Sequence, residues 1–156
     1  SEIKVAPSPM RVRHRLHAVG VRPISNIVDV TNYILFECGQ PLHSFDLDKL
    51  RGGRIVVEPA REGEKFITLD GQERVLTDRD LCIRDAERPV GLAGVMGGLN
   101  TEITDQSRNV FWKRGLSARY HPQDFAAAGT FFRSSYRFER GIDQQRTVWL
   151  WTGPVP

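Results

Sequence analysis

The chain has 156 residues, of which 40% are hydrophobic and 26% charged, and its formal net charge is +3 at pH 7. These values are those of an ordinary soluble globular protein, and so small a charge does not by itself indicate a nucleic-acid-binding protein. No signal peptide is visible, and no apolar run approaches the roughly 18 residues that cross a bilayer. We therefore expect a cytoplasmic protein with no membrane partner.

Two helices are predicted in the first forty residues. The first covers residues 9–19, with Ser8 as its N-cap and Gly20 as its C-terminal stop. The second covers residues 26–37, where apolar side chains recur on one face, and it ends at Gly39.

A cluster of basic side chains lies on and just after the first predicted helix. Its members are Arg11, Arg13, His14, Arg15 and Arg22. Two interpretations stay open: a solvent-exposed helix face, which the pattern alone favours, or a patch that binds phosphate groups.

After Asp46 the sequence changes to short runs of β-branched residues separated by turns. Asp70-Gly71 predicts a hairpin over residues 65–76 with a two-residue type I′ turn. A short helix is expected at 121–129. Further strands are expected within residues 52–60, 80–98 and 108–112. The order of elements predicts an α+β fold, with a central mixed or antiparallel sheet flanked by helices.

The sequence gives no sign of a metal or nucleotide site. The four histidines lack the spacing of zinc ligands, and no phosphate-binding glycine loop is present. The two cysteines, Cys38 and Cys82, lie far apart and outside any paired motif. They indicate a reducing compartment, with both thiols buried as small apolar groups.

Two segments are chemically unusual. In "ECGQPLHSFD", His43 precedes Asp46 by three residues, and this carboxylate could orient the imidazole. The alternative is a histidine that only caps a loop. In "GLAGVMGGLNTE", Gly94, Gly97 and Gly98 would let a ligand approach the backbone closely, or would only allow tight sheet packing.

Four motifs occur in order along the chain: "RPISNIVDVTNYILFECGQPLHSFDLDKL", "TLDG", "GLAGVMGGLNTEIT" and "SYRFERGID". Together they resemble the B3/B4 domain, the editing module of the β subunit of bacterial phenylalanyl-tRNA synthetase. The resemblance covers residues 5–143. It implies one B3/B4-like domain over residues 1–156, in which residues 144–156 form a truncated or divergent tail.

The resemblance carries expectations about activity and partners. The parent enzyme is an α2β2 ligase that attaches phenylalanine to tRNA(Phe), and its ATP and magnesium belong to the synthetic site. The module would need no cofactor. It would bind the tRNA 3′ end and hydrolyse the ester of wrongly attached tyrosine, with the α subunit and the other β-subunit domains as partners. A second pocket that hydrogen-bonds the tyrosine hydroxyl is needed because a phenylalanine pocket rejects an added hydroxyl only weakly.

The matching motifs also imply site residues. Thr31 and Asn32 of "VTNY", His43 of "QPLHSFD" and Gly97 of "GVMGG" would line the pocket. His43 and Asn32 would contact the terminal ribose or the attacking water, and Gly97 would let the backbone approach the tyrosine ring.

Three positions depart from the family pattern. Lys113 stands where the family has a glutamate that accepts a hydrogen bond from the tyrosine hydroxyl, whereas lysine has donors only. Phe132 and Ser134 stand where the family has threonine and alanine. The resemblance therefore leaves three functions open: an editing hydrolase, a non-catalytic structural piece of the β subunit, or a freestanding paralogue with a remodelled pocket.

The "YRFERG" motif contains Arg137, Glu139 and Arg140. We expect these residues to form an ion-pair cluster that holds the last helix to the sheet. Contact with tRNA is the alternative, but the glutamate weakens phosphate attraction.

Overall fold

The computed structural model of the chain describes residues 2–114. The predicted helix at 121–129 and the residues Phe132 and Ser134 lie outside this part, as does the cluster at 137–140. Within residues 2–114 no helix is long and apolar enough to cross a membrane.

Helix α1 spans Met10–Ala18, one residue shorter at each end than predicted. The predicted cap is wrong: Pro9 is the N-cap, with ψ of 146°, and no side chain bonds the first turn. Pro9 O accepts the N–H groups of Val12 and Arg13. The start of the helix is thus shifted past Ser8, whose buried hydroxyl has no hydrogen-bond partner within the described part of the chain.

Helix α2 spans Asn26–Cys38 and matches its prediction closely. The Ser25 hydroxyl accepts a hydrogen bond from Val28 N, which satisfies one free N–H of the first turn. At the other end Gly39 takes the left-handed conformation with φ of 71°, and its N–H bonds Leu35 O. Both ends of the helix that carries Thr31 and Asn32 are therefore fixed by local interactions.

The described strands form three antiparallel sheets, which confirms the α+β class. One is the ribbon of β1 (Leu42–Asp46) and β8 (Val110–Arg114). The largest has the order β2 (Val56–Pro59), β5 (Leu81–Arg84), β6 (Pro89–Leu92) and β7 (Met96–Gly97). The third is the hairpin of β3 (Lys65–Ile67) and β4 (Glu73–Val75). Short 3₁₀ turns lie at Leu47–Lys49, Arg51–Gly53 and Leu99–Thr101.

The predicted hairpin is confirmed, but its turn type is wrong. A type I′ turn needs positive φ at both central residues, and no described residue other than glycine has positive φ. The N–H of Gly71 bonds Thr68 O, and Gly71 has φ of 77°. Thr68 N bonds Gln72 O, so the loop has three residues and ends on a left-handed glycine, the next most common hairpin connection.

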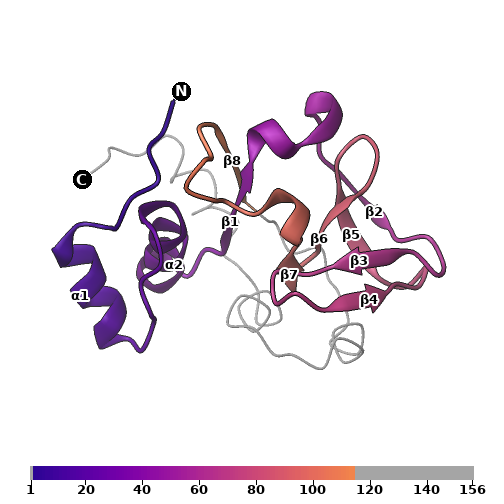
Figure 1. The fold of residues 1–156 in the computed structure, drawn as a ribbon. Coiled ribbons are helices and arrows are strands. Elements are labelled where there is room, and N and C mark those ends of the chain that lie inside the picture. Colours follow the sequence, from indigo (N-terminus) through magenta and orange to yellow (C-terminus); the bar gives the residue numbers. More distant parts are fainter. Residues whose placement is uncertain (1, 115–156) are drawn as a thin grey trace.

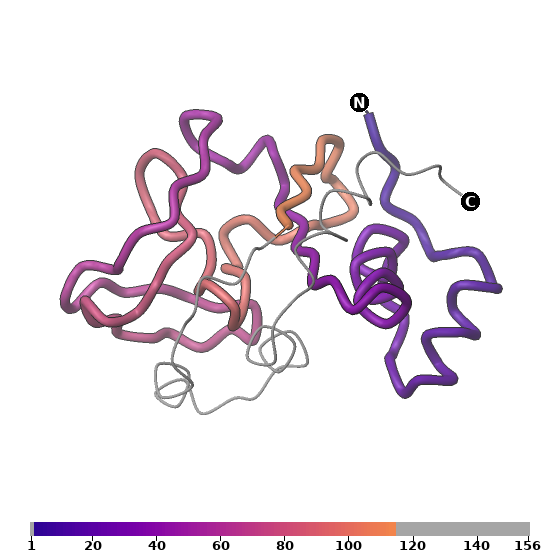
Figure 2. The backbone as a smooth tube through the Cα atoms, turned by 180° about the vertical axis from the view of Figure 1, so that it is seen from behind, coloured from indigo at the N-terminus to yellow at the C-terminus, as the bar shows by residue number. Residues whose placement is uncertain are grey.

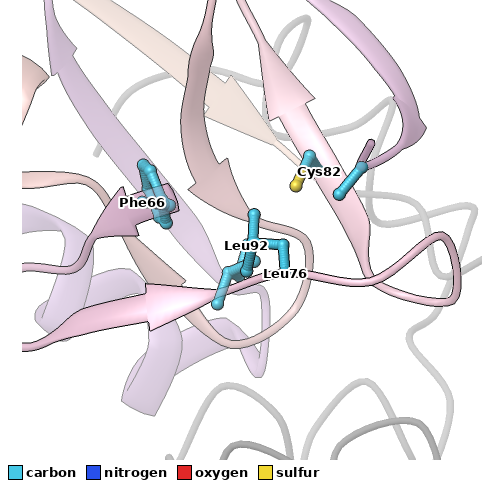
Figure 3. Close-up of a cluster of buried hydrophobic side chains, with 5 residues drawn as sticks. Phe66, Leu76, Cys82 and Leu92 are labelled. Carbon is cyan, nitrogen blue, oxygen red and sulfur yellow. The ribbon is translucent and has the colours of Figure 1, made fainter. Parts of the chain in front are cut away.

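One buried apolar cluster lies between the hairpin and the largest sheet, and another consists of Phe45, Ile83 and Val90. Figure 3 shows the first cluster, whose buried apolar side chains are Ala60, Phe66, Leu76, Cys82 and Leu92. Cys82 is buried, as predicted, whereas Cys38 is only half-buried.

Long-range contacts bring the hairpin loop to β7. Thr68 bridges Gly98, and Leu69 N bonds Gly97 O at 3.1 Å. The two helices lie at one end of the molecule and the hairpin at the other, with β1 leading from α2 toward the strands (Figures 1 and 2). This arrangement leaves the site between α2, β1 and β7.

Candidate functional site

An open cleft of about 630 Å³ lies where α2, β1, β7 and the hairpin loop meet. It is large enough for a small ligand or a nucleotide end. Thr31, Asn32, His43 and Gly97, the four residues singled out by motif, all line it. The other described residues that line it are Gly20, Val21, Leu35, Pro41, Leu42, Leu69, Asp70, Val95 and Met96.

Helix α2 presents two polar side chains to the cleft. The Thr31 hydroxyl donates to Val28 O at 2.6 Å, so only its lone pairs remain for a ligand. Asn32 makes no side-chain hydrogen bond to any described residue. Its amide therefore offers both a donor and an acceptor to the cleft.

The imidazole of His43 lies against Gly97. A Cβ atom built on Gly97 would overlap Nε2 and Cε1 of His43. On its other side the ring packs edge-on against Phe45, with ring centroids 4.5 Å apart. A glycine is needed at position 97 because any side chain there would displace the histidine.

The environment of His43 keeps its ring uncharged. Burial, with a further contribution from the positive charge of Lys113, lowers the pKa of His43 from 6.5 to about 4. Lys113 lies close enough to contribute because strand pairing puts His43 of β1 opposite Lys113 of β8. Facing residues of an antiparallel pair project to the same side.

Lys113 opens onto a smaller cavity of about 80 Å³, which borders the cleft. His43 and Gly97 line both spaces. Burial lowers the pKa of Lys113, and no carboxylate among residues 2–114 pairs with its amine. Lys113, which stands where the family has a glutamate, thus lies next to the predicted site, and its side chain can only donate hydrogen bonds.

The proposed orientation of His43 by Asp46 is wrong. Residues three apart on a strand project to opposite faces. The Asp46 carboxylate instead accepts from the Ser107 hydroxyl at 2.6 Å and from Asp48 N, and it lies 3.5 Å from the Lys49 amine. It fixes the turn that follows β1 and takes no part in the cleft.

One acidic residue of the cleft was predicted only as a turn residue. Asp70 accepts from the Thr68 hydroxyl at 2.5 Å and pairs with Arg74 at 3.0 Å. The hydrogen bond from Thr68, together with Gln72 N and Arg74, holds the pKa of Asp70 below its usual value. The "TLDG" motif contains this residue, but the contact of the loop with Gly97 that brings it to the cleft is not local in sequence.

The cleft combines a neutral imidazole, a carboxamide with no hydrogen-bond partner among residues 2–114, and a glycine-lined wall. Such groups can hold a hydroxyl or water by hydrogen bonds and donate to a developing oxyanion. No group of three or more His, Cys, Asp or Glu side chains within residues 2–114 could hold a metal ion. Phe132 and Ser134, the other two predicted substrate contacts, lie outside the described residues.

These features define an α+β domain in which the described residues form an open cleft with polar and glycine-lined walls. A family model described as the B3/4 domain matches residues 1–150, and the chain belongs to that family. The chain is also similar to phenylalanine–tRNA ligase β subunits. It is 62% identical to that of Oleidesulfovibrio alaskensis over 91% of this chain, and 61% identical to that of Nitratidesulfovibrio vulgaris over 90%.

The chain spans only 18% of the length of these two relatives. The relative from Bacillus cereus is 49% identical over 93% of this chain. A crystal structure of an N-terminal fragment of the phenylalanyl-tRNA synthetase β subunit from Pyrococcus horikoshii aligns with 55% of this chain and 32% of its own. Its TM-score is 0.46 and its identity 18%.

Proposed function

We propose that this chain is the editing module of a phenylalanine–tRNA ligase β subunit and hydrolyses the ester that joins tyrosine to tRNA(Phe). The observation that carries the proposal is the convergence of Thr31, Asn32, His43 and Gly97 on one cleft. The module would act in the cytoplasm, with the ligase α subunit and the other β-subunit domains as partners. It would need no cofactor of its own.

In the proposed reaction a water attacks the ester carbonyl, and the terminal ribose leaves as an alcohol that takes up the proton. An ester is already activated, so positioning and oxyanion stabilisation can supply most of the acceleration. With a pKa of about 4, His43 is a weak base, and its role would be to align the water or ribose hydroxyl through a neutral ring nitrogen. The Asn32 amide would donate to the oxyanion.

Lys113 favours a second candidate function. Its half-buried amine can donate to a phenol oxygen but cannot accept the phenol proton. A pocket altered in this way would edit tyrosine poorly. It would suit a non-catalytic structural role in the β subunit, or a freestanding protein that acts on another aminoacyl ester.

The test is deacylation of tyrosyl-tRNA(Phe) by this chain, compared with spontaneous hydrolysis and with an intact ligase. We expect a slow but enzyme-dependent rate that His43→Ala lowers by up to about 100-fold, the cost of misplacing a reacting group by about 1 Å. Arg79→Ala is the control, because Arg79 is exposed and lies outside both the cleft lining and the basic segment. A rate equal to spontaneous hydrolysis would favour the non-catalytic function.

A further inference from the structure

A basic segment lies near the start of the chain. Residues 3–28 contain Lys4, Arg11, Arg13, Arg15 and Arg22, together with two histidines, and no acidic residue. Five of the 22 Lys and Arg residues lie there but none of the 19 Asp and Glu residues, so the rest of the chain has a formal net charge of −2. Residues 106–138 are a second basic stretch, with six Lys and Arg residues and one Asp, but residues 3–28 are the basic stretch that lies wholly within the described part of the chain.

The fold exposes these charges. The five cations are all solvent-exposed, as are His14 and His17, whereas Leu16 of the same helix is buried. Arg11 and Arg15 are one helical turn apart, so they share one side of α1. Within the described part of the chain, Arg11, Arg13 and Arg22 have no ion-pair or hydrogen-bond partner, so their charges stabilise no described structure.

The basic segment adjoins the cleft. The guanidinium of Arg15 donates to the Tyr33 hydroxyl and lies 5.9 Å from the centroid of its ring. Tyr33 follows directly after Thr31 and Asn32 on α2. Gly20 and Val21, which follow α1, line the cleft themselves. Figure 1 shows α1 at the outer end of the molecule with α2 beside it.

We propose that the exposed cations of residues 4–22 form an RNA-binding surface that holds the backbone phosphates leading to the 3′ terminus in the cleft. This inference rests on the proposed function. If the 3′ ester of an RNA lies in the cleft, the rest of the RNA strand must leave the cleft past one of its walls. The wall formed by residues 20 and 21 is continuous with the basic segment. Phosphate contacts of this kind position a strand without reading its sequence.

The magnitude follows from counterion release. For a single strand the logarithm of the binding constant falls by about 0.7 per phosphate contact for each tenfold rise in salt. Loss of two contacts should therefore lower the salt slope by about 1.4. If the variant and the unmodified chain bind equally at 1 M salt, the loss of two contacts should weaken binding at 0.1 M by about 25-fold.

The experiment measures binding of a fluorescently labelled tRNA(Phe) transcript, carrying no amino acid, to the full chain between 50 and 200 mM KCl. The test variant is Arg11→Gln with Arg15→Gln, which removes two charges from one side of α1. The control is Arg54→Gln with Arg79→Gln, which changes the net charge equally at exposed positions outside the segment. We expect weaker binding and a smaller slope for the test pair, and little change for the control pair.

Three results would overturn the inference: no tRNA binding by the unmodified chain, unchanged affinity and slope in the test pair, or an equal loss in the control pair. If the test pair unfolds, as judged by circular dichroism, Arg22→Glu in the loop after α1 replaces it, with Arg79→Glu as its control. The same criteria then apply.

A second measurement separates this surface from the proposed hydrolysis. Tyrosine esterified to adenosine alone lacks the phosphates, so the test pair should hydrolyse it like the unmodified chain while kcat/KM for tyrosyl-tRNA falls. If no ester is hydrolysed but the test pair still loses tRNA affinity, the surface stands and the hydrolytic function fails. If tyrosyl-tRNA is hydrolysed and the test pair is unaffected, the surface fails and the function stands.

Discussion

Replacing Gly97 with alanine tests the contact that positions His43. The new Cβ would overlap Nε2 and Cε1 of His43 and would lie 3.2 Å from Leu69 Cδ1. Gly97 has no positive φ, so its backbone conformation accepts alanine without strain. The imidazole must therefore move, because the methyl group takes the space that it occupies.

Two effects should follow from Gly97→Ala. Overpacking of this kind costs about 1–3 kcal/mol of the free energy of unfolding. Displacement of a positioning group by about 1 Å can cost about 100-fold in rate. Urea unfolding measures the first effect, and deacylation of tyrosyl-tRNA(Phe) measures the second.

Gly91→Ala is the matched control, since Gly91 of β6 pairs with Gly97 of β7. A Cβ atom on Gly91 would have its nearest neighbours at 3.5 Å and 3.6 Å, which are ordinary contacts, so we expect a small effect. His43→Ala should remove the overlap, so Gly97→Ala should destabilise the His43→Ala background much less. A coupling energy near zero between the two sites would refute the packing argument, since residues in contact couple by about 0.5–3 kcal/mol.

Three further predictions concern the charges and caps. Because the neutral form of His43 predominates above a pKa of about 4, hydrolysis should be constant from pH 8 to 5 and fall below. Because the pKa of His43 is lower in the folded chain than in the unfolded chain, the free energy of unfolding should fall by up to about 3 kcal/mol as pH falls from 6.5 to 4. The His43→Gln variant should not show this loss. Lys113→Glu, alone or with Phe132→Thr, should raise the selectivity for tyrosine over phenylalanine in deacylation assays by about ten- to over a hundredfold. This factor corresponds to the free energy of a buried hydrogen bond to a charged acceptor. Ser25→Ala should lower unfolding stability in urea by about 1 kcal/mol, whereas Ser8→Ala, which removes an unpaired hydroxyl, should not.

Local signals predicted the helices and the hairpin well. The cap at Ser25 and the stop at Gly39 act within a few residues, so α2 could be placed from sequence. The same rule failed at Ser8 because Pro9 itself adopts the cap conformation and moves the helix start by one residue. The turn type failed because Asp-Gly also suits a loop in which only the glycine has positive φ.

Strand β1 was not predicted from the sequence. Because this strand was missed, Asp46 was wrongly expected to orient His43. The five residues of β1, "LHSFD", show no alternation of apolar and polar side chains, and its partner β8 lies about 65 residues away. Such a strand is specified by its pairing rather than by its own pattern. The site residues were found from motif resemblance, because spacing alone cannot bring α2, β1 and β7 together.

The β1–β8 pairing also links selectivity to protonation. Since His43 and Lys113 face each other, the charge at position 113 acts on the imidazole, and under the proposed function it would act on the substrate as well. Lysine helps to keep His43 neutral, whereas a carboxylate there would raise the pKa of His43 and move the acid limb of the rate profile to higher pH. Lys113→Gln removes the charge but keeps a hydrogen-bonding group, so the limb should move less than in Lys113→Glu. An unchanged limb in both variants would mean that burial alone sets the protonation of His43.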